Sequence, residues 1–415
     1  MKGIVVTVIF SIVNFIVQAQ WVNTTSGTSV NLNDVYFISA DTGFVAGDSL
    51  TIRKTVNGGN SWSNVTIDNL GLGASAAVKK ITFNSNKTVG IAVGNFGNNY
   101  YFLRSTDGGN TWNKTSQITT FGINAVSFYD TLQVFAVGDT SELFYSGSAG
   151  STWTLNTFNG FDRSITDISC KNGTCVACLT SGAIYKTTSA NGSWNIIKQT
   201  DSINLKGIVL VNEDTILAVG ETANNSYLLT SYNGGSNWLP PLNMQVENIN
   251  DIFFPTTLTG FVVGGSPLSS ANSQYIATTA DAGFTWQQQN EATFKELNAV
   301  FFIDALNGFA VGDSGTIIKT TNGGITGIKT LEHSLAFEVF PNPVNDMLSV
   351  TIKNKKYQFA EIEIYNITSQ KILSETLNNT NNVFEVNIQG LLSGMYFCRI
   401  VTDSGNSDVL RLIKH

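Results

Sequence analysis

Apolar residues along this chain occur in short runs in which Val, Ile, Leu and Phe alternate with Thr, Ser and Asn, and Gly-rich turns separate the runs. Alternation with a period of two predicts half-buried β-strands joined by hairpins. A second kind of run is apolar throughout, as in Gly43-Phe-Val-Ala-Gly-Asp48 and Gly308-Phe-Ala-Val-Gly-Asp313. Such runs predict strands that are covered on both faces. The pattern therefore predicts an all-β protein.

The strand pattern repeats, and each repeat ends in one short motif that begins with Ser or Thr and ends with Trp. A period of about 41 to 50 residues predicts stacked supersecondary units rather than one conventional core. The seven copies are Thr55 to Trp62, Ser105 to Trp112, Ser146 to Trp153, Thr187 to Trp194, Ser231 to Trp238, Thr279 to Trp286 and Thr320 to Gly327.

The last copy of the motif has Gly327 where Trp is expected, and the missing Trp is found near the N-terminus. Trp21 opens a segment that leads to Leu32-Asn-Asp-Val-Tyr-Phe37, just as Trp286 leads to Leu297-Asn-Ala-Val-Phe-Phe302. The N-terminal segment is therefore predicted to supply the outer strand of the last repeat. This exchange closes a ring of sheets, so residues 20–327 are predicted to form a closed seven-bladed β-propeller.

The repeat stops after residue 327, and a short connector at 328–334 leads to a different pattern. Six or seven short alternating strands within residues 335–415 predict a small Ig-like β-sandwich. The whole chain is thus expected to be all-β, a seven-bladed β-propeller followed by this sandwich.

The N-terminal residues 1–19 combine a basic start, an apolar stretch and a small-residue end at Ala19, which predicts a signal peptide. The alternative is a membrane helix, but the apolar run is short and Asn14 interrupts it. We expect a mature protein with no transmembrane segment. A net charge of -7 argues against a nucleic-acid partner.

Four cysteines bear on the export prediction. An Asn172-Gly173 turn would place Cys170 opposite Cys175 as a non-hydrogen-bonded pair, so a cross-strand disulfide is possible in an exported protein. The sequence leaves open whether this bond forms. Cys178 has no fourth ligand nearby for zinc, and the chain has two His, so we expect neither a metal nor a cofactor.

The repeated motif resembles the Asp-box of bacterial neuraminidase repeats, Ser/Thr-x-Asp-x-Gly-x-Thr-Trp. A short acidic or amide side chain at its third position, such as Asp107 or Asn57, can accept backbone N–H groups within its own turn. We therefore expect these residues to make turns rather than to bind ligands. Residues 21–327 resemble the propeller family typified by photosystem II stability and assembly factors. The resemblance implies a fold more than a function, since propellers host unrelated activities.

The C-terminal module resembles the type A sorting domain of the type IX secretion system of Bacteroidetes. Three blocks carry the resemblance: Phe340-Pro-Asn-Pro-Val344 with Asp346 and Leu348, the strand at Gly394-Met-Tyr396, and the ending Leu412-Ile-Lys414. It implies that residues 335–415 engage the secretion machinery. The protein would then be secreted or attached to the outer-membrane surface after passage through the periplasm.

Candidate chemistry is sparse in the propeller. Its three arginines are Arg53, Arg104 and Arg163, and two of them lie on expected third strands, which does not suit the arginine triad of sialidases. No catalytic residue is assigned, and a binding protein is favoured over an enzyme.

Seven acidic residues are expected at one end of the central channel, next to the first and second strands. They could bind a cationic patch, a metal ion or a polar polymer, or they could form a solvated acidic rim, which we favour because Lys79, Lys80 and Lys206 would weaken the field. The seven candidates are Asp34, Asp48, Asp139, Asp167, Glu221, Asp251 and Asp313.

These features predict a monomeric, secreted or cell-surface binding propeller whose ligand is an extracellular protein or a polysaccharide. The alternative is a secreted carbohydrate-active enzyme, related to glycoside hydrolases, that uses carboxylates on the propeller face.

Overall fold

The computed structural model describes most of the chain between residues 21 and 414. Within that range it leaves out 69–75, 98, 120–121, 140–141, 158–162, 191–192, 201, 224, 247, 267–272, 290–291, 325–336, 353–359, 367–369, 378–382, 403–404 and 407–409. The predicted signal peptide and the predicted connector at 328–334 both lie outside the described residues. No helix in the described part is long and apolar enough to cross a membrane.

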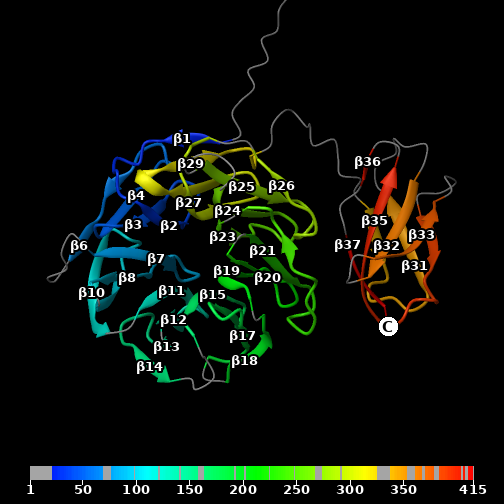
Figure 1. Cartoon of the computed structure of the whole chain (residues 1–415), viewed down its shortest axis with the longest axis horizontal. Coiled ribbons are helices and arrows are strands. Elements are labelled where there is room, and N and C mark those ends of the chain that lie inside the picture. Colours follow the sequence, from blue (N-terminus) through cyan, green and yellow to red (C-terminus); the bar gives the residue numbers. More distant parts are fainter. Residues whose placement is uncertain are drawn as a thin grey trace, which may run out of the picture.

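The described strands of residues 21–324 form seven sheets arranged in a ring (Figure 1). Each sheet runs outward from a first strand near the axis. The first sheet along the chain consists of β2 (Leu32–Phe37), β3 (Gly43–Gly47), β4 (Thr51–Thr55) and β5 (Ser63–Asn64). The second consists of β7 (Ala77–Phe83), β8 (Gly90–Phe96), β9 (Asn99–Ser105), β10 (Thr111–Thr119) and β6 (Thr66–Asp68). The third consists of β11 (Ile123–Phe128), β12 (Val134–Gly138), β13 (Glu142–Ser146) and β14 (Thr154–Thr157).

Three more sheets continue the ring with the same meander. They are β15 (Ile165–Lys171), β16 (Thr174–Leu179), β17 (Ile184–Thr187) and β18 (Asn195–Lys198); β19 (Asn204–Leu210), β20 (Ile216–Glu221), β21 (Ser226–Ser231) and β22 (Leu242–Asn243); and β23 (Asn248–Phe253), β24 (Gly260–Ser266), β25 (Ser273–Thr279) and β26 (Gln287–Gln288).

The seventh sheet contains both ends of the propeller sequence. It consists of β27 (Leu297–Phe302), β28 (Gly308–Gly312), β29 (Ile317–Thr320) and β1 (Val22–Thr24). Val22 pairs with Lys319, and the buried Trp21 indole Nε1 donates a hydrogen bond of 2.6 Å to Gln289 Oε1. The N-terminal strand β1 therefore forms the outer edge of the last sheet.

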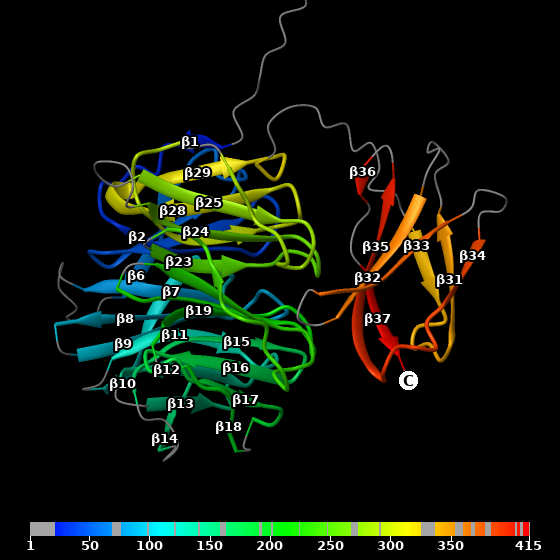
Figure 2. The ribbon, with the colours of Figure 1, turned by 45° about the vertical axis from the view of Figure 1, so that its right-hand side comes forward.

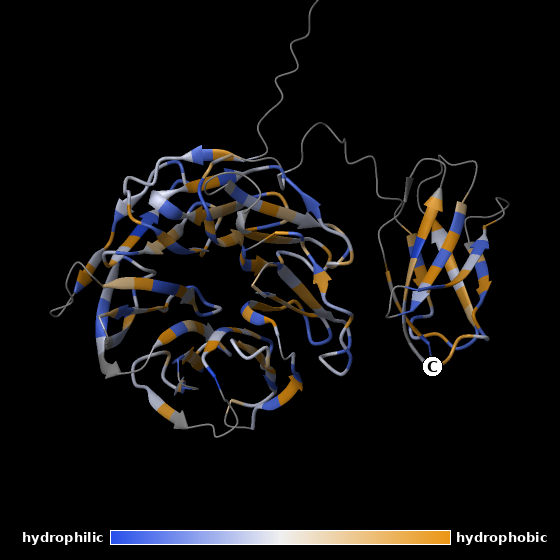
Figure 3. Ribbon diagram, in the orientation of Figure 1, coloured by the Kyte–Doolittle hydropathy of each residue, from blue (hydrophilic) through white to orange (hydrophobic). Residues whose placement is uncertain are grey.

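The second strands are the most deeply buried part of each sheet. Every residue of β3, β12 and β28 is buried, because each apolar strand lies between the strands of two neighbouring sheets. Trp112, at the end of a repeated motif, has no exposed surface and contacts Phe83 and Phe44 edge to face. Figure 3 shows that, over all the strands of the ring, hydrophobic positions are interspersed with hydrophilic ones. Burial on both faces explains why these runs lack polar residues.

The repeated motifs form tight turns on the outer part of the sheets. In Ser105 to Trp112, Asp107 Oδ1 accepts the N–H groups of Asn110 and Thr111, and Ser105 Oγ accepts that of Gly109. Burial alone would raise the pKa of Asp107, but the hydrogen bonds from Thr111 and Ser105 outweigh it and lower the pKa to about 2. Gly109 has φ +80, which a side chain would strain. The turn-making role expected for the motif is confirmed by these bonds.

The first strand of each propeller sheet contains a β-bulge. In β2 the register shifts between Leu32 and Asp34, so Asn33 is the extra residue, and the same shift occurs in the first strand of all seven described sheets. Bulges of this kind redirect a side chain. Asp34 was expected next to the first strand, and it lies within that strand.

The described C-terminal strands form two sheets. One contains β30 (Phe337–Phe340), β31 (Met347–Ile352) and β34 (Val383–Asn387). The other contains β33 (Lys371–Thr376), β32 (Ala360–Asn366), β35 (Gly394–Thr402), β36 (Gly405–Asn406) and β37 (Leu410–Lys414). Leu348, Ile362 and Ile400, all fully buried, belong to the core between the sheets. Figure 2 shows this module beside the propeller.

Candidate functional site: the mouth of the central channel

The seven bulges place seven side chains around one end of the propeller channel, which we call the mouth. The cavity at the mouth has a volume of about 470 Å³. The bulge residues, in chain order, are Asn33, Lys79, Asn124, Thr166, Lys206, Asn250 and Asn298, and all seven line the cavity.

The bulge asparagines bridge neighbouring sheets. Asn124 Nδ2 donates to Asp139 Oδ1 and to the carbonyl oxygen of Ile165 in the next sheet, both at 3.0 Å. Asn33 makes the same pair of bonds to Asp48 and Val78, and Asn298 makes it to Asp313 and Leu32. Three predicted site residues, Asp48, Asp139 and Asp313, thus accept an amide hydrogen bond at the mouth.

The asparagines themselves were not among the predicted site residues. Their signal in the sequence is an apolar residue followed by Asn at the start of a first strand, as at positions 32–33, 123–124, 249–250 and 297–298. Asn250 differs in its carboxylate partner, since it donates to Glu296 Oε1 at 2.8 Å. Glu296, which directly precedes the first strand β27, was also missing from the predicted site residues.

Asp34, Asp167 and Asp251 form a second tier, one residue further along their strands. Each accepts a backbone N–H from the next sheet: Ile81 at 2.7 Å, Ile208 at 3.0 Å and Val300 at 2.9 Å, respectively. We expected a solvated acidic rim, but Asp34 is 4% exposed and Asp167 is 9% exposed. Neither residue therefore belongs to such a rim. These carboxylates connect neighbouring sheets, and the seven acids occupy two tiers rather than one ring.

Lys80 lies among the three aspartates of the second tier, and its Nζ is 3.4 Å from Asp34 Oδ1. Burial raises the pKa of both Asp34 and Asp167 to about 6, although the charge of Lys80 opposes the shift. Burial disfavours the ammonium of Lys80, but Asp34, Asp251 and Asp167 outweigh it and raise the pKa of Lys80 above its usual value. Lys80 therefore stays charged at neutral pH.

The mouth is mixed in charge. Its charged lining residues are three acids, Asp48, Asp167 and Asp251, and three lysines at positions 79, 80 and 206. Glu221, the remaining predicted site residue, forms an ion pair of 2.6 Å with Lys206. Among the described residues, no group of three or more His, Cys, Asp or Glu could hold a metal ion. This balance suits a neutral polar ligand better than a cation.

A second cavity of about 170 Å³ lies further along the channel and shares Lys80, Asp167 and Asp251 with the first. One side of its wall is aromatic: the half-buried Phe301 contacts Tyr36 at 5.0 Å and Phe253 at 4.9 Å between ring centroids. Hydroxyl side chains also line it, at Thr82, Ser127 and Ser169. The channel thus combines polar groups at its mouth with an aromatic wall further in.

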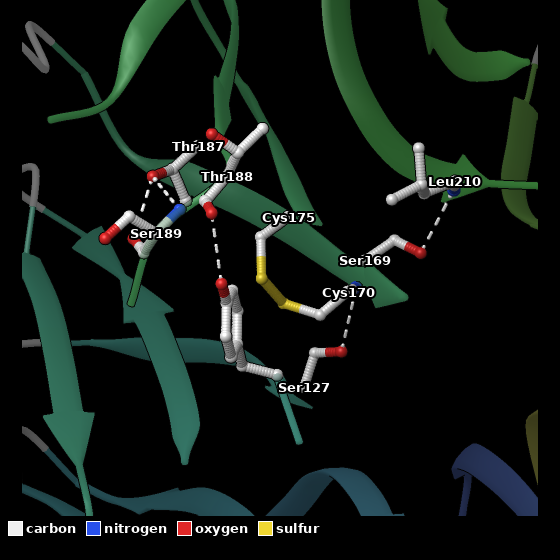
Figure 4. Close-up of a disulfide and its surroundings, with 9 residues drawn as sticks. Ser127, Ser169, Cys170, Cys175, Thr187, Thr188, Ser189 and Leu210 are labelled. Carbon is white, nitrogen blue, oxygen red and sulfur yellow. Dashed lines mark hydrogen bonds between the residues drawn. A yellow bond between two sulfur atoms is a disulfide. The ribbon is translucent and has the colours of Figure 1, made fainter. Parts of the chain in front are cut away.

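Cys170 and Cys175 are joined by a disulfide across the β15–β16 hairpin, with an S–S distance of 1.94 Å (Figure 4). The backbone N–H of Cys170 donates to Ser127 Oγ of the neighbouring sheet at 3.1 Å. Cys178 is buried and has a free thiol, as has Cys398. Neither disulfide cysteine lines the mouth.

Comparisons with known proteins give two family matches. Residues 338–415 match the secretion system C-terminal sorting domain, and residues 68–243 match the photosynthesis system II assembly factor YCF48. No curated protein matches the chain in sequence. The resemblances to an assembly-factor propeller and to a sorting domain are confirmed by these matches.

Solved structures support the same fold. YCF48 bound to D1 peptide is 17% identical, with a TM-score of 0.58, over 73% of this chain and 97% of that one. YCF48 from Cyanidioschyzon merolae is 17% identical, with a TM-score of 0.58, over 72% of this chain and 98% of that one. A GH74 enzyme from Niastella koreensis is 13% identical, with a TM-score of 0.58, over 95% of this chain and 74% of that one. At these identities the likeness shows the fold alone.

Proposed function

The chain joins a propeller of the photosynthesis system II assembly factor type to a secretion-system C-terminal sorting domain, and we propose that it is an exported binding protein whose channel mouth takes an extracellular polymer. The sorting domain supports a secreted or cell-surface location and an interaction with the secretion machinery. The proposed ligand is a polysaccharide or a segment of a protein, and the channel favours the polysaccharide.

The mixed lining of the mouth carries this proposal. Amide and ammonium donors stand beside carboxylate acceptors around a cavity of about 470 Å³, and acidic and basic groups are balanced in number. Ligand sites commonly combine a few such polar groups with aromatic surface. Sugar rings carry hydroxyl groups and also apolar faces, so the polar mouth and the aromatic wall at Tyr36, Phe253 and Phe301 match both parts of a sugar.

The D1 peptide bound to one YCF48 does not transfer to this chain as a ligand. That contact belongs to a protein only 17% identical in sequence. The propeller of this chain has three arginines, at positions 53, 104 and 163. The guanidinium group of Arg53 already donates hydrogen bonds to the carbonyl oxygens of Gly27 and Trp62 within the propeller. The likeness to YCF48 therefore does not support photosystem assembly as the function of this chain.

The test is retention of the exported protein on immobilised glycans and on extracellular proteins. Replacing Lys79 and Lys206 with Ala removes two donors from the mouth without touching the bonds of the bulge asparagines to their carboxylates. We expect affinity to fall at least about tenfold, the effect of 1.4 kcal/mol. The matched control replaces Lys114 and Lys198 with Ala, which removes the same charge from the outer strands β10 and β18. Equal retention of the mouth variant and the control would refute the site.

A carbohydrate-active enzyme is the second candidate. The raised pKa values of Asp34 and Asp167, about 6, are typical of carboxylates in catalytic sites. The GH74 enzyme also aligns with 95% of this chain. Against this, both carboxylates accept backbone hydrogen bonds that connect the sheets. Shortening of a captured glycan, abolished by Asp167→Asn, would decide for the enzyme, and capture without shortening would decide for the binding protein.

A further inference from the structure

Phe397 of the sorting domain points away from the core of its own module. On strand β35, the alternate residues Tyr396, Cys398 and Ile400 belong to that core, so Phe397 faces the opposite side of the sheet. An outward aromatic ring at such a position is normally exposed to solvent. Phe397 is only 5% exposed, because the propeller covers it.

The cover consists of two aromatic residues from neighbouring motif turns of the propeller. Tyr232 and Phe284 stack with their ring centroids 4.8 Å apart and their planes at 7°. Phe397 meets both rings edge on, at 4.9 Å from Tyr232 and 4.4 Å from Phe284. Offset-stacked and edge-to-face contacts are the favourable arrangements of aromatic pairs. We call Tyr232, Phe284 and Phe397 the aromatic clamp.

The motif turn itself does not require these aromatics. Tyr232 occupies the second position of its motif and Phe284 the sixth position of the next one. At each of these two positions, the other six copies have no aromatic residue. They carry Val56, Thr106, Gly147, Thr188, Ala280 and Thr321 at the second position, and Asn60, Asn110, Ser151, Gly192, Ser236 and Ile325 at the sixth.

The propeller half of the clamp is held in place by a hydrogen bond between the two turns. The Tyr232 hydroxyl donates to the carbonyl oxygen of Ala282 at 2.9 Å, which fixes the Tyr232 ring against the turn that carries Phe284. A cavity of about 340 Å³ adjoins the clamp, and apolar side chains from both modules, Leu258 and Leu410, line it. On the propeller side, the two stacked rings are therefore held in a fixed arrangement, and both modules contribute apolar surface to the contact.

We propose that the aromatic clamp is a docking site by which the propeller holds its own sorting domain in one orientation. Docking covers part of the outer face of the sheet that contains β35, and the sheet that contains β31 remains on the far side of the sorting-domain core. It thereby selects which face of the sorting domain is open to the secretion machinery. Loss of the sorting domain would uncover the stacked rings of Tyr232 and Phe284 on the propeller rim. This inference does not rest on the ligand proposed for the channel mouth.

The test uses the full exported chain and small-angle scattering in solution. Phe397→Ala and, separately, Phe284→Ala each remove one ring from the clamp. We expect each to lower the docking equilibrium at least about tenfold and to increase the maximum dimension of the molecule. Hydrogen exchange should also become faster in the two turns, residues 231–238 and 279–286, and remain unchanged in β31. The matched control is Ile372→Ala on β33, where the side chain is already 41% exposed in the same sheet.

The two clamp variants alter different modules, so the test can be interpreted even if one of them does not fold. Phe397→Ala leaves the sorting-domain core intact, since Phe397 is not part of it. Phe284→Ala alters the propeller side, so it reports on docking even where the first variant fails to fold. Dimensions and exchange that match the wild type in a folded clamp variant would overturn the proposal. A wild-type chain that is already extended in solution would overturn it as well.

Discussion

Lys80 should stabilise the propeller only while its aspartate neighbours are charged. Lys80→Met keeps the length of the side chain and removes its charge, which leaves Asp34, Asp167 and Asp251 facing one another in the second tier of the channel. Removing one partner of a buried ion pair typically costs about 3–5 kcal/mol. The side chain of Lys80 is 29% exposed to the channel, so we expect a loss near the lower limit, about 3 kcal/mol at about pH 8.

The loss should shrink in acid because Asp34 and Asp167 then carry protons. The folded-state pKa values of Asp34 and Asp167 are about 6, raised from 3.8. The stability linked to their protonation is therefore fully present below about pH 4 and is lost as pH rises through about 6. Without Lys80 these pKa values rise further, so the pH range over which this stability is lost moves to higher pH. At about pH 4.5 the variant should be within about 1 kcal/mol of the wild type.

Urea unfolding followed by tryptophan fluorescence at both pH values measures this difference. Lys79→Met is the matched control, since Lys79 is exposed at the mouth one residue away, and it should change stability by less than about 0.5 kcal/mol. Adding Asp34→Asn to Lys80→Met should restore part of the loss at about pH 8. An equal loss at both pH values, or no loss at about pH 8, would contradict the assigned electrostatics.

Three further predictions concern other parts of the fold. Trp21→Ala should destabilise the propeller by about 3–5 kcal/mol in chemical unfolding, because it removes a buried ring from the closing sheet; a loss below about 1 kcal/mol would mean that the ring closes without it. Reduction of the Cys170–Cys175 disulfide should cost about 2 kcal/mol, given the very short loop that it closes, and the double Ser variant should show the same change without responding to reductant. Glu363→Gln should weaken the sorting domain by about 2 kcal/mol at neutral pH. Burial opposes the shift, but hydrogen bonds from Tyr365, Lys371 and Arg399 lower the pKa of Glu363 to about 2, so its contribution is present above about pH 4.5 and lost as pH falls towards 2. Hydrogen exchange in β32 and β35 at both ends of this window would reveal any pH-independent loss, which would disprove the ionic role.

The architecture could be predicted because a recognisable sequence motif marks the end of each repeat. The Trp motif makes a turn through hydrogen bonds among neighbouring residues, as Asp107 does with Thr111, so its signal is local and easy to recognise. Closure was predictable for a similar reason: Trp21 replaces a residue that the last motif lacks. The apolar second strands were equally clear, since burial on both faces excludes polar residues.

The details of the channel could not be predicted in the same way. Asp34 is buried because it accepts the N–H of Ile81, and 47 positions separate these residues along the chain. Only the ring places them side by side, so the sequence pattern suggested a solvated acid. The residues of the aromatic clamp are separated even further along the sequence, because motif turns of the propeller contact a strand of another module. No periodicity within either module indicates that contact.

The seven bulges make the mouth a set of interchangeable positions on a constant backbone. Amide, hydroxyl and ammonium groups already occupy equivalent places, at Asn124, Thr166 and Lys206 for example, with the same register shift behind each. Because a bulge redirects its side chain without requiring a particular one, mutation can alter the chemistry presented there one sheet at a time. Related chains could therefore diverge widely in specificity while their propellers remain superimposable, and the residues at these seven positions would distinguish one specificity from another.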